Sequence, residues 1–550
     1  MLTILRAAVL AVMALAIFAP APAWAQWLRA ETDHFIIYGA GSERSLRAYA
    51  ERVERFDFLL RTYYPIRVDH EIPKLEIFLA EGRRDMLLAE PGISASIGGF
   101  YSPNSGRIHA VVNNQSDMGD QVMFHEYGHH FMFQMRANAY PSWFVEGFAE
   151  YYATAEIRPD RIQFGRHSEG RMLMFVQQPV NSWAPLADVL KWRISDSGRY
   201  RAGDYYAQAW GLTHYLMSTP ERTRMLGQYL AAVSRGEDSI VAMQAATGRT
   251  PEQLQNDMRL YLTGSIRVQT PQIEIPTPRV EITRLSPVES ELAWLDLRLD
   301  REPIKVEAPE PREGETERAR EARERDMREY TEARATLISD ALAAGARHPD
   351  ARIAQLVQAR AHRLEGRSEA GFEVLEPLLT GDESDPITLR LAAELLLDMA
   401  KSETDPAQAT GHRREARAYL TRALDADPLD FRIYLALNES RSGEATYPTD
   451  NDISTLEIGS TLAPQSFDMR MRLARAYMAR GLYGEAIMTV QPVANSPHGG
   501  AWAARAKALA ASALTAMGQA APPIEDAPSD EAPSDDSSSD EAGQPAVAAH

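Results

Sequence analysis

One stretch of the sequence combines side chains that can bind a metal ion with spacings that helices can bring together. His125 and His129 are four residues apart with Glu126 between them, and Glu146 and Glu150 follow at the same spacing. Residues four apart lie about one turn above each other on an α-helix, so two imidazoles can face one point. Two imidazoles with an adjacent carboxylate are the ligands and the general base that a zinc hydrolase needs.

An apolar stripe supports a helix around the first histidines. Phe124, Tyr127, Phe131 and Met135 recur at helical spacing, which predicts that one side of this helix is buried in a core. Gly128 lies within the pattern, although glycine in a helix interior costs up to about 1 kcal/mol. We expect this glycine to let another element approach closely.

A second helix is predicted to carry the two later glutamates among Trp143, Phe144 and Phe148. Glu146 in so apolar a setting needs a partner, because an unpaired buried carboxylate is costly. A zinc ion would be such a partner, and Glu150 would orient one of the histidines through a hydrogen bond. The alternative for the histidines is that they are ordinary, satisfied surface residues.

The HExxH motif followed by WFVEGFAEYY resembles the gluzincin metallopeptidases of the peptidase MA clan. The resemblance implies one Zn²⁺ ion bound by His125, His129 and Glu146, with Glu126 as the general base for hydrolysis of a peptide bond. The 16 residues between His129 and Glu146 are fewer than in the zinc aminopeptidases of this group, which implies a shorter link between the helices.

A later segment, GDYYAQAWGLTHYLM, resembles the helix of these enzymes that carries a transition-state tyrosine. The resemblance implies that Tyr206 donates a hydrogen bond to the oxyanion, with Tyr205 as the neighbour that could take this place instead. For either tyrosine alone, an aromatic helix face packed in a core is the alternative. His109 and His214 are predicted to be structural, and His130 is predicted to point away from the metal.

The segment GGFYS departs from the aminopeptidase pattern. Tyr101 stands where those enzymes carry the glutamate that binds the free amino end of the substrate. Without that anion a terminal ammonium group loses its main electrostatic partner, so we expect an endopeptidase rather than an aminopeptidase. The same strand can pair its backbone with an extended peptide.

The composition and the amino-terminal end limit the chemistry and the compartment. The 550 residues allow two or three domains and include no cysteine, so histidine and carboxylates are the strong metal ligands left. Residues 1–25 join Arg6 to an apolar run that ends in Ala23, Trp24 and Ala25, which predicts a cleaved signal peptide rather than a membrane anchor. We therefore expect an exported bacterial protein, periplasmic or secreted, with no transmembrane segment in the mature chain.

The charge of the chain is strongly negative. A formal net charge of −19 counts against nucleic acid as a partner, because an acidic surface repels phosphate backbones. Part of this charge lies in residues 519–550, which are predicted to be a disordered acidic tail because they are too polar to form a core.

The pattern of strands and helices in the first half of the chain predicts an α+β, zincin-like catalytic domain over residues 26–266. Strand and helix patterns alternate over residues 26–115, which predicts an α/β lobe with a small mixed sheet, and helical periodicity dominates residues 116–266, a helical lobe. A Pro-rich linker over residues 267–311 and a charged helix over residues 312–346 are expected to follow.

Residues 347–518 resemble an array of tetratricopeptide repeats. Prolines recur at intervals of 37, 42, 36 and 33 residues, near the repeat length of about 34. These prolines are Pro349, Pro386, Pro428, Pro464 and Pro497. The resemblance implies an all-α solenoid that recruits a peptide or protein partner. The alternative is a plain helical domain in which these prolines recur by chance.

Together these patterns favour a secreted zinc metallopeptidase whose repeats recruit a protein partner or substrate. One alternative is a catalytically inactive, peptidase-like scaffold or binding protein of the cell envelope. Another is a zinc hydrolase that acts on a different bond, because a ligand set determines the metal and not the bond that is cleaved.

Overall fold

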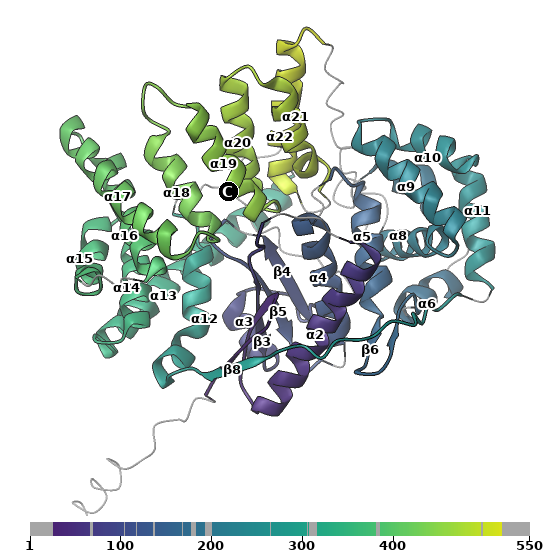
Figure 1. Ribbon diagram of the computed structural model, residues 1–550, viewed down its shortest axis with the longest axis horizontal. Coiled ribbons are helices and arrows are strands. Elements are labelled where there is room, and N and C mark those ends of the chain that lie inside the picture. The colour runs from purple at the N-terminus through teal and green to yellow at the C-terminus, as the bar shows by residue number, and fades with distance from the viewer. Residues whose placement is uncertain are drawn as a thin grey trace, which may run out of the picture.

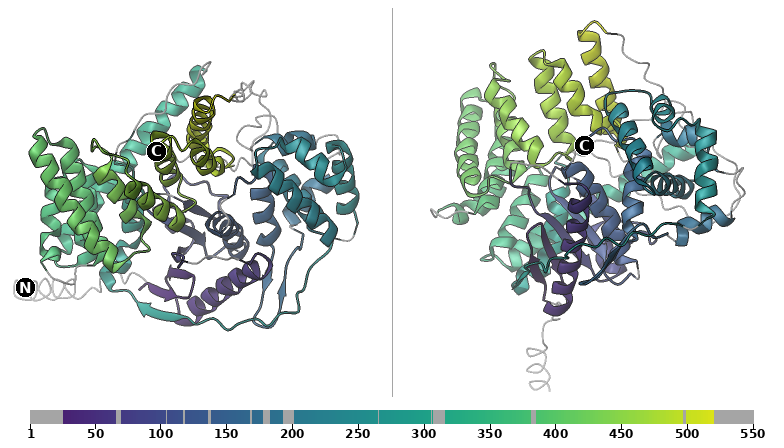
Figure 2. Two further views of the ribbon diagram at one scale, coloured as in Figure 1. Left: turned by 45° about the horizontal axis from the view of Figure 1, so that its top comes forward. Right: turned by 45° about the vertical axis from the view of Figure 1, so that its right-hand side comes forward.

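The computed structural model describes residues 26–519, except for short segments at 66–69, 104, 117, 136–137, 168, 178–182, 193–200, 265, 305, 307–315, 381–384 and 497–498. The predicted signal peptide and residues 520–550 of the predicted tail lie outside the described residues. Figures 1 and 2 show a sheet with helices packed on it, a helical lobe beside it, and a C-terminal array of helices above and to the left. Within the described part, no helix is both long enough and apolar enough to cross a bilayer.

A mixed six-stranded sheet lies at the centre, in the order β4-β5-β3-β2-β1-β8. Strands β2, β3 and β5 run parallel to one another, whereas β1, β4 and β8 are antiparallel to their partners. The strands are β1 Leu28–Glu31, β2 Phe35–Gly39, β3 Leu75–Ala80, β4 Gly99–Pro103, β5 Ile108–Asn113 and β8 Glu281–Arg284. Strand β4 is one edge of the sheet, and it is the strand that was predicted to be able to pair its backbone with an extended peptide.

Helices cover both faces of this sheet. They are α2 Glu43–Tyr63, α3 Arg83–Ala89, α4 Gly119–Met135 and α12 Pro287–Arg301. Successive side chains of a strand point to opposite faces, so Ile77 and Leu79 of β3 enter a core with α2 and α4. Phe78 and Ala80 enter a second core with α3 and α12. The sheet is therefore the middle of three layers.

The Pro-rich segment, expected to be an extended connector, instead contains a strand and a helix of this unit. Strand β8 pairs with β1 along its whole length, and α12 places Trp294 against Trp27 and Phe78. The start of α12 is a capping box in which Ser286 and Glu289 satisfy each other's backbone N–H groups. Proline content alone does not reveal that β1 pairs with β8, or that the sheet face packed against α3 is also covered by α12.

A helical lobe follows α4, at the right of Figure 1. Its elements are α5 Ser142–Ala153, β6 Glu156–Ile157, β7 Ile162–Gln163, α6 Glu169–Gln177, α7 Leu186–Lys191, α8 Ala202–Leu216, α9 Pro220–Ser234, α10 Ser239–Thr247 and α11 Pro251–Leu262. The prediction of a mixed α+β fold, with a small N-terminal sheet and a mostly helical remainder, is confirmed.

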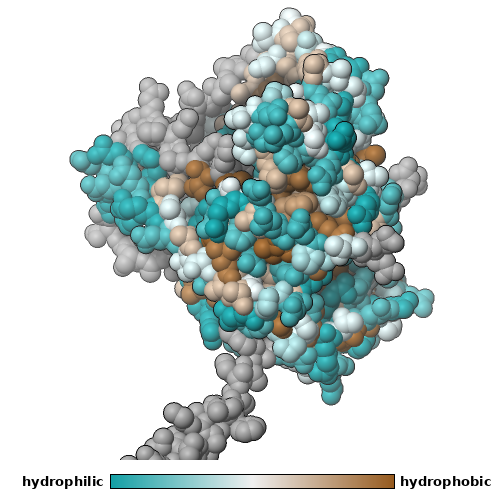
Figure 3. Space-filling view, turned by 90° about the vertical axis from the view of Figure 1, so that its left-hand side faces the viewer, coloured by the Kyte–Doolittle hydropathy of each residue, from teal (hydrophilic) through white to brown (hydrophobic). Residues whose placement is uncertain are grey.

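The remaining helices form the C-terminal helical region, in which each helix packs against the next. They are α13 Glu317–Arg347, α14 Arg352–Leu364, α15 Ser368–Leu379, α16 Pro386–Ser402, α17 Pro406–Ala426, α18 Phe431–Arg441, α19 Asp450–Leu462, α20 Phe467–Ala479, α21 Tyr483–Ala494 and α22 Gly500–Ala516. Figure 3 shows that one face of the molecule is largely hydrophilic, with apolar residues gathered toward its middle.

The recurring prolines mark helix boundaries in this region. Pro386 occupies the first turn of α16, where its missing N–H costs no helical hydrogen bond, and Pro349, Pro428 and Pro464 lie in turns between helices. Pro497 lies outside the described residues. The four described prolines therefore lie at boundaries between helices of this region.

A cluster of charges joins the C-terminal helical region to the sheet. Asp300 of α12 lies 2.8 Å from Arg360 Nε of α14, 3.6 Å from Arg107 Nη1 beside β5, and 3.7 Å from Arg432 Nη1 of α18. Burial alone would raise the pKa of Asp300, and the charges of the three arginines lower it below its usual value. The carboxylate is therefore ionised and connects three parts of the molecule.

We predict that Trp294→Ala lowers the free energy of unfolding by about 3–5 kcal/mol, because it removes a buried indole from the second core of the sheet. Urea unfolding followed by circular dichroism measures this change. The control is Leu260→Ala, a residue of α11 that is 58% exposed, for which we expect little change. Equal effects of the two substitutions would contradict a structural role for α12 in this unit.

Candidate metal centre

Helices α4, α5 and α8 cross at short distances because glycines stand at the crossings. A Cβ atom added at Gly128 of α4 would lie 3.1 Å from the Cα atom of Ala149 on α5. A Cβ atom added at Gly147 of α5 would overlap Thr213 Oγ1 and the carbonyl oxygen of Ala209 on α8. The expected close approach at Gly128 is therefore found, and it brings the polar residues of α4 and α5 together.

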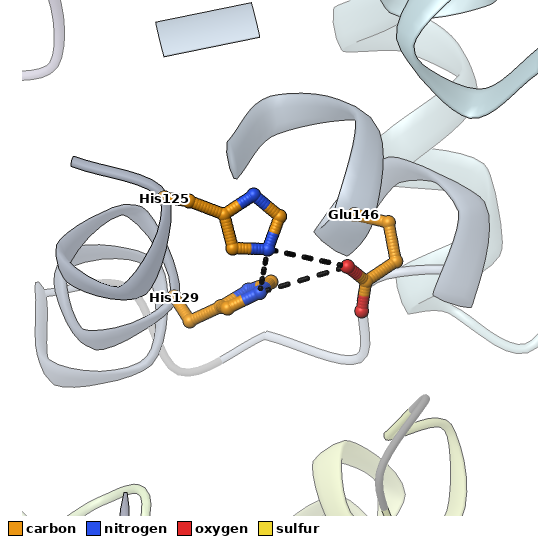
Figure 4. Close-up of side chains that lie close together, drawn as sticks. All are labelled: His125, His129 and Glu146. Atoms are coloured by element: carbon orange, nitrogen blue, oxygen red, sulfur yellow. Dashed lines mark hydrogen bonds and ion pairs between the residues drawn. The ribbon is translucent and has the colours of Figure 1, made fainter. Parts of the chain in front are cut away.

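His125, His129 and Glu146 converge at this crossing, as Figure 4 shows. The two Nε2 atoms of the histidines are 3.1 Å apart, and they lie 3.7 Å and 3.6 Å from Glu146 Oε2. Tetrahedral coordination with bonds of about 2.0–2.1 Å places ligand atoms about 3.3 Å apart. The spacing of these three donor atoms therefore fits one small, four-coordinate ion.

Glu150 and Arg171 orient the imidazole of His125 from its Nδ1 side, opposite the Nε2 atom. Glu150 Oε1 lies 3.5 Å from His125 Nδ1, so a proton on Nδ1 leaves the Nε2 lone pair facing the other donors. Arg171 of α6 donates two hydrogen bonds to Glu150, of 3.0 Å and 2.7 Å. Burial alone would lower the pKa of Arg171, but the charge and the hydrogen bonds of Glu150, together with Tyr206 and Glu146, raise it above its usual value.

Sequence reasoning did not identify Arg171 as part of this site. The available signal was that a glutamate predicted to be buried needs a cation. No spacing rule indicates which arginine supplies it, because α6 approaches α5 only in the folded chain. The structure thus adds one charged residue to the predicted set.

Glu126 faces the edge strand β4. Asn113 N of β5 donates a hydrogen bond of 2.8 Å to the carbonyl oxygen of Gly98, so the backbone groups of Gly98 point toward β5. Those of every second residue after it point the same way. Because the direction alternates along an antiparallel strand, the N–H of Tyr101 points outward, and it donates to Glu126 Oε2 at 3.1 Å. A backbone N–H of the edge strand therefore holds the carboxylate that stands between the two histidines in sequence.

Of the two adjacent tyrosines, Tyr206 lies at the site. Its ring is 6.5 Å from the ring of His125, and the guanidinium of Arg171 lies 5.2 Å from its ring centre. Burial, followed by the charges of nearby carboxylates, raises the pKa of Tyr206 well above its usual value, so its phenol remains a hydrogen-bond donor. Tyr205 is buried elsewhere and donates to the carbonyl of Trp192 at 3.1 Å.

Two other histidines lie in the core, away from the three donors. His109 has no exposed surface, and its Nδ1 atom is 3.0 Å from the carbonyl oxygen of Arg107. Burial lowers the pKa of His109 well below its usual value. His214 lies between the carbonyl oxygen of Gly165 at 2.9 Å and the hydroxyl of Tyr261 at 2.8 Å. Both imidazoles have hydrogen-bond partners and pack among aromatic rings.

A second cluster of potential ligands consists of His34, Glu54 and Asp57. Here the oxygens of Asp57 already accept hydrogen bonds from the Tyr127 hydroxyl and from Arg61. His34 Nδ1 lies 2.9 Å from Glu54 and 3.3 Å from Asp57, as one donor shared by two carboxylates. This cluster is an ion network that attaches Tyr127 of α4 to helix α2. Tyr127 follows Glu126 directly in the sequence.

Comparison with known proteins adds one finding. A family described as "Protein of unknown function (DUF1570)" matches residues 122–237, a segment that includes His125, Glu126, Glu146 and Tyr206. No curated protein and no solved structure matches the chain. The part of the chain shared with that family is therefore the part that carries this site.

We predict that Gly147→Ala destabilises the crossing of α5 and α8 by about 1–3 kcal/mol, because the added methyl group meets a backbone carbonyl that cannot move aside. Thermal unfolding monitored by circular dichroism measures the loss. Gly227→Ala is the matched control, since a Cβ atom there meets nothing within 4 Å on α9 and alanine favours a helix. A loss of stability in both variants would contradict the close-packing argument.

Proposed function

We propose that this protein is a zinc-dependent metallopeptidase, in which His125, His129 and Glu146 bind the metal. The observation that carries the proposal is the convergence of their three donor atoms within 3.1–3.7 Å of one another. Two histidines and one glutamate, with a fourth position left open, form a ligand set typical of catalytic zinc. A zinc ion there would act as a Lewis acid and lower the pKa of water to about 7.

The protein residues have separate tasks in this proposal. Glu126 accepts a proton from the attacking water and returns it to the leaving amine, while the N–H of Tyr101 keeps its carboxylate in place. Tyr206 donates a hydrogen bond to the oxyanion of the tetrahedral intermediate. Glu150, fixed by Arg171, keeps the imidazole of His125 oriented.

The edge strand supports a peptide as the substrate. Apart from the N–H of Tyr101, which is bonded to Glu126, the outward-facing backbone groups of β4 can pair with an extended chain and align it next to the metal ligands. Tyr101 occupies the position where the zinc aminopeptidases have a glutamate, and its phenol bonds His130 at 3.1 Å. Because no carboxylate stands there to bind a terminal ammonium, we propose cleavage inside a chain rather than at its amino end.

The C-terminal helical region is proposed to recruit a protein partner or substrate. Each of its helices packs against the next, and the sequence around Tyr477 and Gly481 resembles the tetratricopeptide motif. Leu473 and Ala476 of α20 enter one core, and Ala486 of α21 enters the next. Stacked helices of this kind form extended surfaces that suit peptide binding.

We predict that the purified protein contains one zinc ion per chain and that Glu146→Ala abolishes this content, because the two imidazoles alone leave the site short of a ligand. Elemental analysis after extensive dialysis measures the stoichiometry. The control is Glu237→Ala, an exposed glutamate that should leave the zinc content unchanged. Parent protein without stoichiometric zinc would contradict the proposal.

We predict that Glu126→Gln retains zinc and loses at least about 10²-fold in peptide hydrolysis, because the amide cannot accept the proton from water. Cleavage of a denatured protein or a peptide library, followed by mass spectrometry, measures the rate. The parent activity should disappear with a chelator and return with added zinc. Equal cleavage by Glu126→Gln and the parent would show that this mechanism is wrong, even if zinc is bound.

A further inference from the structure

Strand β4 packs along one face of helix α4. Val122, Glu126 and His130 follow one another at four-residue spacing, so they share one face of this helix. A Cβ atom added at Gly99 of β4 would lie 2.7 Å from Val122 Cγ1, so the strand approaches the first of these residues closely. Tyr101, two residues further along the strand, contacts the other two. The edge strand therefore lies against three successive turns of the helix that carries both predicted histidine ligands.

Tyr101 contacts α4 at two points that are one helical turn apart. Its backbone N–H donates to Glu126 Oε2 at 3.1 Å, and its phenol oxygen lies 3.1 Å from His130 Nδ1. The rings of Tyr101 and His130 meet edge to face, with 5.5 Å between their centres. Because the backbone and the side chain of one residue make these two contacts, the hydrogen bond to His130 restricts the orientation of the N–H at Glu126.

His130 is itself held by groups that connect α4 to α2. The residue is 4% exposed, and its ring stacks on that of Tyr127 with 5.6 Å between the ring centres. The Tyr127 hydroxyl donates to Asp57 of α2, and the other carboxylate oxygen of Asp57 accepts a hydrogen bond from Arg61. The ring that meets the Tyr101 phenol is therefore fixed relative to the core of the sheet.

The place of β4 at the edge of the sheet makes this contact important. One side of β4 pairs with β5, and among the described residues no strand pairs with its other side. The N–H of Tyr101 is on that free side, where an edge strand presents its backbone groups without a neighbouring strand. No ladder hydrogen bond fixes the direction of this N–H, so its aim at Glu126 depends on the contacts between Tyr101 and α4.

We propose that His130 is a positioning residue for the general base Glu126 and acts through Tyr101. This inference rests on the proposed peptidase function and adds to it a residue that binds neither the metal nor the substrate. His130 fixes the phenol of Tyr101, and the N–H of the same tyrosine fixes the carboxylate of Glu126. A displacement of about 1 Å at a reacting group can cost about 10²-fold in rate, so loss of this hydrogen bond lowers turnover.

The test uses the full-length, zinc-loaded protein and the variant Tyr101→Phe, which removes the hydroxyl and keeps the ring and the backbone N–H. We expect kcat to fall about tenfold, with the KM for a peptide substrate and the zinc content unchanged, because the metal ligands and the outer edge of β4 stay intact. His130→Phe keeps a ring that can stack on Tyr127 and should lower kcat to a similar extent. The double variant should show no further loss, because both substitutions break the same hydrogen bond.

The matched control is Tyr261→Phe. The hydroxyl of Tyr261 lies 2.8 Å from His214 Nδ1, so this variant breaks the same kind of hydrogen bond, but on α11, which packs against α7 and α8. Its kcat should equal that of the parent. Zinc content and thermal unfolding show whether each variant is folded, and Tyr101→Phe alone carries the test if His130→Phe does not fold.

Three outcomes would overturn the positioning role alone: parent-like kcat in Tyr101→Phe, an equal loss in Tyr261→Phe, or additive losses in the double variant. Absence of zinc-dependent hydrolysis in the parent would overturn the proposed function, and this inference with it.

Discussion

Glu146 is a carboxylate with no exposed surface at the crossing of two helices. Taking an ionised carboxylate out of water is costly unless other charges or a metal ion compensate it. The surroundings of Glu146 must therefore supply such a partner. The Nε2 atoms of His125 and His129 lie within 3.7 Å of it. The arrangement of α4, α5 and the residues behind them follows from the need to place this carboxylate and these two imidazoles around one point.

Small residues and buried ion networks make that arrangement rigid. Gly128 and Gly147 let α4, α5 and α8 approach closely, because a Cβ atom at Gly128 would press on Ala149 and one at Gly147 would overlap α8. The Asp57 network attaches α4 to α2, and the Arg171 pair attaches α5 to α6. Because every one of these contacts adjoins a predicted ligand or its neighbour, the surrounding packing restricts the donor atoms to a narrow range of positions.

The unit around the central sheet and the C-terminal helical region share contacts that a flexible connector would not provide. Strand β8 and helix α12 belong to the central sheet and its second core, and Asp300 of α12 contacts arginines of two C-terminal helices. Under the proposed function, a peptide recruited by these helices would meet a metal centre whose β4–β5 turn contacts Arg432 of α18. Recruitment and cleavage would then depend on one continuous body rather than on two tethered ones.

The sequence by itself determined the type of site and its elements. The spacing of His125 and His129 and the apolar residues around them predicted the two helices, because helical periodicity is a local property, and the resemblance to the gluzincins implied that Glu146 joins the two histidines. The mixed sheet and the helical remainder were predictable for the same reason. The linker prediction failed where a strand and a helix depend on distant partners for their burial.

Only the tertiary structure decided which residues support the site from elsewhere in the chain. Arg171 has no spacing relation to the HExxH motif, and its role arises from a contact between elements that folding brings together. The choice between Tyr205 and Tyr206 also depended on which side of α8 faces α4. Local patterns specify ligand geometry, whereas long-range packing specifies the groups that hold it in place.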